Sequence, residues 1–261
     1  MDLGLQSKRV LVTGASKGIG LACARAFARA GATVIGVSRS QDRLQAARQS
    51  LAADGLTMHS LAADLSDAAA ALALVEAVER EHGPIDVLVN SAGAARRYPP
   101  DELDATAYRQ AMDAKYFTYM HVTQPLIARM AGRGSGSVVN IVGQGGRRAS
   151  EMHVAGGAAN AALMLATAGL ARAYAARGVR VNAINPGLTR TTRVDEGLQA
   201  EARATGRQPD QLLAEAVASI PAGRLAEPEE IANVALFLAS NLASYVSGAI
   251  IPMDGCSASV I

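Results

Sequence analysis

Short apolar runs of mostly β-branched residues alternate with longer alanine-rich stretches along the whole chain. Between the apolar runs, stretches such as residues 21–31, 69–83 and 161–178 repeat their apolar positions near the helical period and end in glycine. This alternation predicts an α/β fold of the doubly wound, Rossmann type, a seven-stranded parallel sheet with helices on both faces. The seven predicted strands cover residues 9–13, 33–38, 57–63, 85–90, 137–142, 179–184 and 249–254.

The composition favours one globular domain, residues 1–261, without a nucleic-acid or membrane-bound role. Half of the residues are apolar, 18% are charged, and the net charge is only +2. No apolar run reaches the roughly 18 residues of a membrane span, and the N-terminus lacks the pattern of a signal peptide, so we expect a cytoplasmic protein. Cys23 and Cys256 have no metal-ligand spacing, so no metal site is predicted.

One segment, residues 192–225, lacks a strong pattern and is polar and charged. It reads either as a pair of surface helices or as a substrate lid, since mobile covers sit on such insertions.

A glycine-rich turn, TGASKGIG, follows the first predicted strand and leads into a predicted helix. Gly14, Gly18 and Gly20 would let the backbone approach a pyrophosphate, which the helix N-terminus would bind. The strand, turn and helix together predict dinucleotide binding.

The end of the second strand indicates which dinucleotide. An acidic residue there would bind the ribose of NAD, but this chain has Ser38 and Arg39, with Lys17 in the glycine loop. Two cations suit the 2′-phosphate of NADP, so NADP(H) is predicted over NAD(H). The alternative is that both are solvated surface cations.

Together with the glycine loop, several further motifs carry a family resemblance. Residues 64–65, the run NSAG at 90–93, NAINPG at 182–187 with Thr191 downstream, and the C-terminal run from Arg224 resemble the short-chain dehydrogenase/reductase family over nearly the whole chain. Ser91 stands where the family more often has asparagine. The resemblance implies a small-molecule substrate and a homotetramer or homodimer. It implies cofactor contacts from Gly14, Ser16, Lys17, Gly18, Ile19, Gly20, Ser38, Arg39, Asp64, Leu65, Asn90, Ala92, Gly93, Pro186, Gly187, Leu188 and Thr191.

The catalytic tyrosine and lysine of that family are absent. The family pair sits one helical turn apart so that both side chains share a helix face, and no Tyr-x-x-x-Lys occurs anywhere in this chain. By resemblance, the serine, tyrosine and lysine positions fall on Gly143, Gly156 and Asn160. Lys115 falls where the family has a supporting asparagine.

Three substitutes for the missing groups are considered. Lys115, one of only three lysines, would supply an amine from the neighbouring helix, or else is a solvent or interface lysine. His153 would be a proton donor with a pKa suited to neutral pH, or else is structural. Gln144, Arg147 and Arg148 would bind an anionic or carbonyl group, or else are solvated.

The glycines at 156 and 157 are costly at a helix start, so they require either close packing or space for a ligand. Without the tyrosine ring, we expect a void that a bulkier or differently placed substrate fills; decay of an unused site is the competing reading.

Two functions follow from the sequence. One is an NADP(H)-dependent oxidoreductase with a non-standard site, acting on an activated carbonyl, imine or alkene. The other is a catalytically inactive NADP(H)-binding sensor or partner subunit, and fold analogy cannot separate the two.

Overall fold

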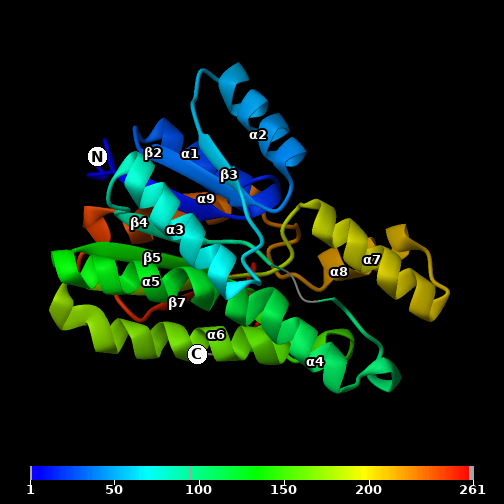
Figure 1. Ribbon diagram of the computed structural model, residues 1–261. Helices are drawn as coiled ribbons and strands as arrows, with labels where there is room; N and C mark the ends of the chain where they lie inside the picture. Colours follow the sequence, from blue (N-terminus) through cyan, green and yellow to red (C-terminus); the bar gives the residue numbers. More distant parts are fainter. Residues whose placement is uncertain (1, 94–95, 259–261) are drawn as a thin grey trace.

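The computed structural model describes residues 2–93 and 96–258 and contains the predicted sheet (Figure 1). All neighbouring strands pair in parallel, in the order β3-β2-β1-β4-β5-β6-β7. The strands are β1 (Arg9–Thr13), β2 (Thr33–Ser38), β3 (His59–Ala62), β4 (Val87–Asn90), β5 (Gly136–Ile141), β6 (Val179–Pro186) and β7 (Ile250–Met253). The predicted fold class is confirmed, and every strand lies within two residues of its predicted bounds.

Helices connect the strands, and polar side chains cap several of them. The side chains of Ser40, Asp67 and Asp104 accept hydrogen bonds from the first turns of α2, α3 and α4. The α-helices of the described residues are α1 (Gly18–Arg29), α2 (Gln41–Ala53), α3 (Ala68–His82), α4 (Ala105–Ala111), α5 (Thr118–Arg133), α6 (Val154–Tyr174), α7 (Thr192–Thr205), α8 (Pro209–Ala218) and α9 (Pro228–Ala239). A π-helix, η2 (Met112–Phe117), joins α4 to α5, and short 3-10 turns are η1 (Pro100–Glu102), η3 (Gln144–Gly146), η4 (Glu151–His153), η5 (Ala175–Arg177) and η6 (Asn241–Ala243).

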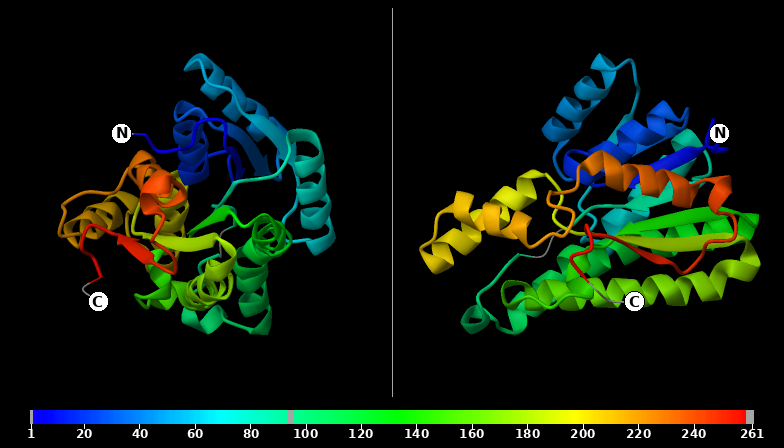
Figure 2. Two further views of the ribbon diagram at one scale, coloured as in Figure 1. Left: turned by 90° about the vertical axis from the view of Figure 1, so that its left-hand side faces the viewer. Right: turned by 180° about the vertical axis from the view of Figure 1, so that it is seen from behind.

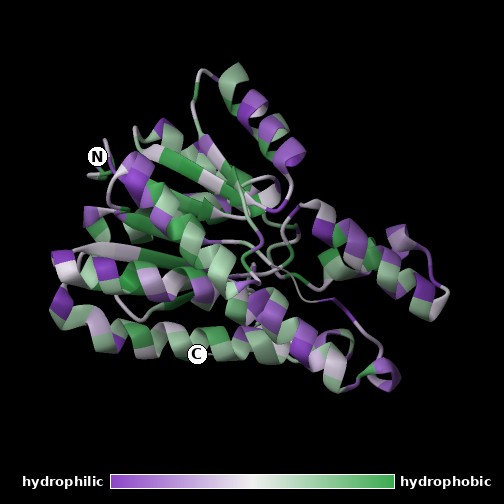
Figure 3. Ribbon diagram, viewed as in Figure 1, coloured by the Kyte–Doolittle hydropathy of each residue, from purple (hydrophilic) through white to green (hydrophobic). Residues whose placement is uncertain are grey.

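The two faces of the sheet bury separate apolar clusters. In β1, Val10 and Val12 pack in the cluster that includes α1, α2 and α9, whereas Leu11 packs in the cluster of α3 and α5. The two views of Figure 2 show these helix layers on either side of the strands, and Figure 3 shows the strands as mostly hydrophobic. This is the side-chain alternation of a sheet buried on both faces.

The helix α6 and its flanking turns form an apolar stretch, Glu151–Arg177, long and apolar enough by composition to cross a membrane. The sequence had not suggested such a stretch. In the fold it packs beside β6 and η2, and 44% of its most apolar window is buried. Part of its apolar surface therefore has partners within the protein, whereas Leu165 is exposed.

The strand order reverses between β1 and β4, and this reversal positions the site. The Thr13 hydroxyl at the end of β1 accepts hydrogen bonds from the backbone N–H groups of Ser91 and Ala92, each at 3.1 Å. The loops after β1 and β4 are thereby held together at the carboxyl edge, where open α/β sheets bind their ligands.

Residues 192–225 contain α7 and α8, which extend beyond this same edge of the sheet (Figures 1 and 2). The lid role of this segment stays a prediction.

Candidate active site

The glycine loop has the backbone that its sequence predicts. Gly14 has φ +71°, and a Cβ atom there would lie 2.8 Å from the Ser91 carbonyl oxygen. A Cβ at Gly20 would collide with the Gly14 carbonyl. These positions therefore require glycine, because the loops after β1 and β4 and the start of α1 approach one another at backbone distance.

The N-terminus of α1 offers donors to an anion. Lys17 occupies its N-cap position in an extended conformation, and no side chain of the described residues caps this helix. The free amide groups and the helix dipole favour a phosphate at this end. Since Thr191 lies over Gly18, with its Cγ2 atom 3.2 Å from the position of a Cβ there, the start of α7 borders the same space.

Of the two predicted phosphate-binding cations, Lys17 is part of the glycine loop and Arg39 follows β2. Arg39 is exposed at the end of β2. The Lys17 amine donates to the Thr192 hydroxyl at 3.0 Å and pairs with the Glu196 carboxylate at 3.3 Å. Lys17 therefore also links the glycine loop to α7.

The residues predicted around the adenine and the loop after β4 line the same edge. Asp64 accepts hydrogen bonds from the hydroxyl and the backbone N–H of Ser66, and these bonds lower the pKa of its carboxyl. Leu65 beside it is buried. The Asn90 amide is fully buried, and within the described part of the chain its Oδ1 atom has no hydrogen-bond partner. An orphaned acceptor at this edge fits a ligand with donor groups.

The end of β6 closes the edge on its other side. The Gly187 N–H donates to the Met253 carbonyl at 2.9 Å, and a Cβ on Gly187 would lie 2.9 Å from Asp254 Cα. Leu188 follows, and Thr191 begins α7. The predicted cofactor residues thus follow β1, β2, β3, β4 and β6 and lie at one edge of the sheet, so they fit a dinucleotide in both arrangement and chemistry.

Lys115 lies on the π-helix η2, and its side chain is buried with 8% exposure. Its amine donates to the Tyr119 hydroxyl and to the Ile141 carbonyl, both at 2.9 Å. The Tyr119 hydroxyl donates to the same carbonyl at 2.6 Å. The solvent and interface alternatives for Lys115 are therefore wrong in this chain, because the amine lies inside the fold at the end of β5.

Burial changes the acid strength of this amine. Burial and, to a smaller extent, the positive charge of Arg193 lower the pKa of Lys115 from 10.5 to about 7. Burial also raises the pKa of the Tyr119 phenol, which therefore remains protonated. Lys115 can accordingly exchange a proton near neutral pH, whereas Tyr119 can only orient it.

The positions predicted to replace the family serine and tyrosine are closely packed. Gly143 has φ +122°, which L side chains rarely adopt, and a Cβ there would lie 3.3 Å from the Asn160 amide nitrogen. A Cβ on Gly156 would collide with the His153 ring. Gly157 packs against the Gly145 carbonyl. The expected void beside Gly156 is therefore wrong, because the imidazole ring of His153 occupies that space.

The pKa of the His153 imidazole differs from the predicted value near neutrality. Burial lowers its pKa to about 4, and the charges of Arg97, Arg193 and Lys115 act in the same direction. Its Nδ1 atom is buried and has no hydrogen-bond partner among the described residues. The imidazole is consequently neutral at pH 7, and the expectation of a proton donor with a pKa near neutrality is wrong.

The three residues predicted to bind a polar substrate group separate into two kinds. Gln144 lies at the site, with its Oε1 atom buried, without a partner in the described chain, and 3.3 Å from the position of a Cβ on Gly187. Arg147 and Arg148 are exposed, and Arg148 contacts the Ser257 carbonyl at 3.5 Å. Of the three, only Gln144 therefore lies against the predicted cofactor residues, next to Gly187.

Sequence reasoning missed three residues. Tyr119 orients Lys115, and Arg97 and Arg193 act electrostatically on His153. The spacing Lys-x-x-x-Tyr at 115–119 is a signal that could have indicated Tyr119, since residues four apart on a helix are neighbours. The two arginines carry no such pattern.

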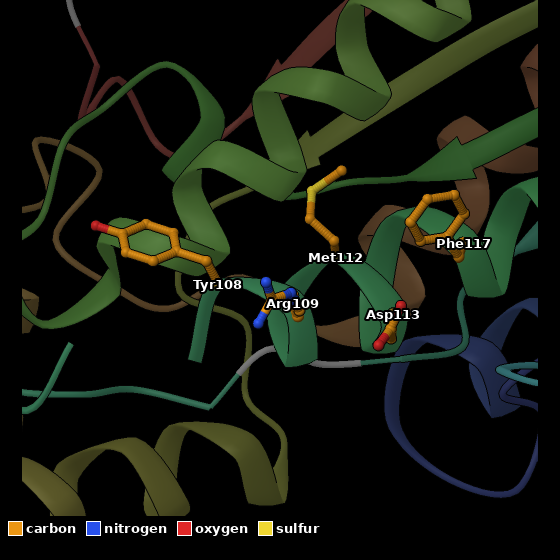
Figure 4. A pocket seen from close by; sticks show the side chains of 5 residues that line it. All are labelled: Tyr108, Arg109, Met112, Asp113 and Phe117. Carbon is orange, nitrogen blue, oxygen red and sulfur yellow. The ribbon is translucent and has the colours of Figure 1, made fainter. Parts of the chain in front are cut away.

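A hollow of about 320 Å³ lies elsewhere on α4 and η2 (Figure 4). Its lining residues are Tyr108, Arg109, Met112, Asp113 and Phe117. None of the predicted catalytic or cofactor residues lines it. Among the described residues, no group of three or more His, Cys, Asp or Glu side chains could hold a metal ion.

Comparisons with known proteins give concordant matches. A family model described as enoyl-(acyl carrier protein) reductase matches residues 14–256. D-threitol dehydrogenase of Mycolicibacterium smegmatis is 36% identical, over 97% of this chain and 94% of that protein. Gluconate 5-dehydrogenase of Gluconobacter oxydans is 34% identical, over 96% and 94%. The crystal structure of L-sorbose reductase from Gluconobacter frateurii, complexed with NADPH and L-sorbose, superposes with a TM-score of 0.92 at 30% identity over 100% of both chains.

Proposed function

Because the chain belongs to the short-chain dehydrogenase/reductase family, we propose that it is an NADP(H)-dependent oxidoreductase in which Lys115 replaces the missing Tyr-x-x-x-Lys pair. The observation that carries this proposal is the buried Lys115 amine, with a pKa of about 7 and hydrogen bonds to Tyr119 and Ile141. A proton-exchanging group at neutral pH is what carbonyl or imine reduction requires after the tyrosine is lost.

The bound cofactor would supply a hydride from the dihydronicotinamide. The glycine loop and the N-terminus of α1 would hold its pyrophosphate, and Asp64 and Leu65 would bracket the adenine. Asn90 to Gly93 would line the cofactor, and Leu188 and Thr191 would hold the nicotinamide carboxamide. Lys17 and Arg39 would bind the 2′-phosphate, which favours NADP(H) over NAD(H). The assignment of Lys17 and Arg39 to the 2′-phosphate is supported by the similar structure of L-sorbose reductase, which contains NADPH.

Lys115 would act as the general acid. In its ammonium form it donates one proton to the carbonyl oxygen or imine nitrogen as the adjacent carbon accepts hydride, and it regains the proton from solvent. The Ile141 carbonyl and the Tyr119 hydroxyl fix the amine at 2.9 Å each, so one N–H remains for the substrate. The Asn160 amide nitrogen, 3.3 Å from the position of a Cβ on Gly143, would donate to the same oxygen.

The substrate is proposed to be an activated carbonyl, imine or alkene. Loss of a positioned acid is worth roughly 10² to 10⁴ in rate, whereas alignment of two reactants contributes roughly 7–11 kcal/mol. A substrate that accepts hydride readily needs less help with the proton. The relatives named above act on polyols and sugar acids by their names, and a small-molecule substrate is the common class.

We further propose that the chain forms a homotetramer or homodimer. Leu165 on α6 and Phe237 on α9 are large apolar side chains that the isolated chain leaves exposed. Size-exclusion chromatography with light scattering measures the assembly directly.

A silent NADP(H) sensor or partner subunit is the second candidate. The observation that favours it is the packing of the His153 ring on Gly156, where the ring occupies the position of a Cβ.

The experiment compares the wild-type chain, Lys115→Met and Lys8→Met. Lys8 is a matched control because it is one of the two other lysines and pairs with Asp86 far from the site. NADPH oxidation is followed on a panel of 1,2-diketones, trifluoromethyl ketones and cyclic imines, and NADPH affinity is measured by calorimetry. Lys115→Met is expected to lower kcat/KM by about 10² to 10⁴ with unchanged NADPH affinity, and Lys8→Met to change neither.

Two results would contradict the proposed enzymatic function. Tight NADPH binding without turnover of any compound by the wild-type chain would favour the sensor. Turnover that Lys115→Met leaves intact would remove Lys115 from the mechanism.

A further inference from the structure

Three basic side chains from separate elements, those of Arg97, Arg193 and Lys115, act electrostatically on His153. Arg193 lies on the first turn of α7, Arg97 on the loop after β4, and His153 on η4. Their charges influence one another: those of Arg97, Arg193 and Lys115 all lower the pKa of His153, and that of Arg193 lowers the pKa of Lys115. Groups from three separate elements therefore bring the same sign of charge to one space.

The contacts of Arg97 place it between α7 and η4. Its guanidinium carbon lies 3.2 Å from the position of a Cβ on Gly197, so the guanidinium packs against α7 where no side chain intervenes. One of its nitrogen atoms lies 3.8 Å from a Glu201 carboxylate oxygen, a long and part-exposed pair. The N–H of the next residue, Tyr98, donates to the Met152 carbonyl at 3.1 Å, which ties this loop to the turn that carries His153.

Arg193 lacks a dedicated counter-charge. In the described part of the chain, residues 2–93 and 96–258, it makes neither an ion pair nor a side-chain hydrogen bond. The nearest carboxylate that acts on it belongs to Glu196, whose oxygen is already 3.3 Å from the Lys17 amine. Arg193 is exposed, so an anion from solvent can reach its guanidinium, and the desolvation by its neighbours lowers its pKa.

We infer that the substrate carries a carboxylate, which Arg193 and Arg97 bind between α7 and the loop after β4 while its carbonyl or imine carbon faces Lys115. The inference rests on the proposed function and narrows its substrate class to carboxylate-bearing carbonyl or neutral imine compounds. A guanidinium presents parallel N–H groups that match a carboxylate in two-point geometry. A cationic iminium, by contrast, would be repelled by the same charges.

The charges around His153 favour an anion in this region of the structure. Neutral His153 adds a polar ring without charge, and the three cations Lys115, Arg97 and Arg193 face it from η2, the loop after β4 and α7. A carboxylate between α7 and that loop would compensate part of this charge. Its binding would therefore favour the ammonium form of Lys115, which is the form that donates a proton.

The test measures binding of matched carboxylate and carboxamide probes to the NADPH-loaded protein by calorimetry. The probe pairs are benzoate with benzamide and succinate with succinamide. The variants are Arg193→Gln and Arg97→Gln, with Arg203→Gln as the control, because Arg203 is an exposed arginine in the last turn of the same helix.

The wild-type chain is expected to prefer each carboxylate by about tenfold or more, the ratio that one charge-assisted hydrogen bond supplies. Arg193→Gln and Arg97→Gln are expected to remove most of that preference, and Arg203→Gln to preserve it. Equal affinity for carboxylate and carboxamide, or equal losses in all three variants, would overturn the inference.

The two proposals fail in different measurements. Carbonyl or imine turnover without any preference for the charged member of a pair would remove the carboxylate site and leave the oxidoreductase. If the chain prefers carboxylates through Arg193 but turns over no compound, the anion site exists and the proposed enzyme does not. That result would overturn the inference that the anion site binds a substrate.

Discussion

The depressed pKa of Lys115 has a consequence for stability that requires no substrate. The amine is buried and its pKa falls from 10.5 to about 7. That difference corresponds to roughly 5 kcal/mol between the charged and neutral forms. The folded chain therefore carries a penalty at acidic and neutral pH that it does not carry at alkaline pH.

The sign of the pH dependence follows from proton binding. Between pH 7 and 10.5 the unfolded chain keeps the Lys115 proton while the folded chain releases it, so the free energy of unfolding rises with pH in this window. From pH 7 to pH 9 the expected rise from this group is about 2 kcal/mol. Below pH 7 both states are protonated, and the penalty is fully present and constant.

The assay is urea unfolding at pH 7, 8 and 9 for the wild-type chain, Lys115→Met and Lys8→Met. Circular dichroism is the suitable signal because the chain has no tryptophan. Cys23, whose pKa burial raises to about 12, lowers stability at the alkaline end, but it contributes equally to all three proteins. The comparison between proteins therefore isolates Lys115.

Between pH 7 and 9, the free energy of unfolding of the wild-type chain is expected to rise by about 2 kcal/mol more than that of Lys115→Met. Lys8→Met should follow the wild-type chain, since Lys8 is half-exposed. Parallel curves for the wild-type chain and Lys115→Met would refute the reasoning, because they would show an amine that titrates alike in the folded and unfolded states.

Two further predictions concern the cofactor and the packing at Gly156. Arg39→Ala is expected to weaken NADPH binding by about tenfold, the effect of one charge-assisted contact, and to leave NADH binding nearly unchanged; equal weakening in calorimetry would contradict the phosphate assignment. Gly156→Tyr is expected to lower the melting temperature because its Cβ meets the His153 ring, whereas Gly156→Tyr combined with His153→Ala should recover most of the loss. If the double variant melts no higher than Gly156→Tyr, the contact with His153 is not the cause.

The fold was predictable because its strands are buried on both faces. β1 and β2 begin and end where their β-branched runs do, at residues 9–13 and 33–38. The edge strands β3 and β7 are shorter than their apolar runs, since the outermost residues find no partner in the neighbouring strand. Local composition thus determines which segments are strands, and pairing determines where they end.

The site was predictable only where a motif fixes the backbone. The glycine loop needs positive φ or close approach at Gly14 and Gly20, and the sequence signals this directly. The rotamer of His153 carries no such signal, and it decides whether the space beside Gly156 is open or filled. Arg97 and Arg193 come from a loop and from α7, which the sequence pattern does not bring together.

The order of residues along η2 and α5 bears on how catalysis could persist without the family pair. A tyrosine followed by a lysine four residues later makes the phenol the acid, with the ammonium lowering its pKa. Here lysine precedes tyrosine at 115 and 119, both are buried, and burial raises the phenol pKa while it lowers the amine pKa. Lys115 and Tyr119 are hydrogen-bonded at 2.9 Å. In this pair the amine, not the phenol, is therefore the group that titrates at neutral pH. Because a buried amine loses its charge more easily than a buried phenol loses its proton in this environment, a reductase built on it should lose activity above neutral pH, where the amine no longer carries the proton that the product requires.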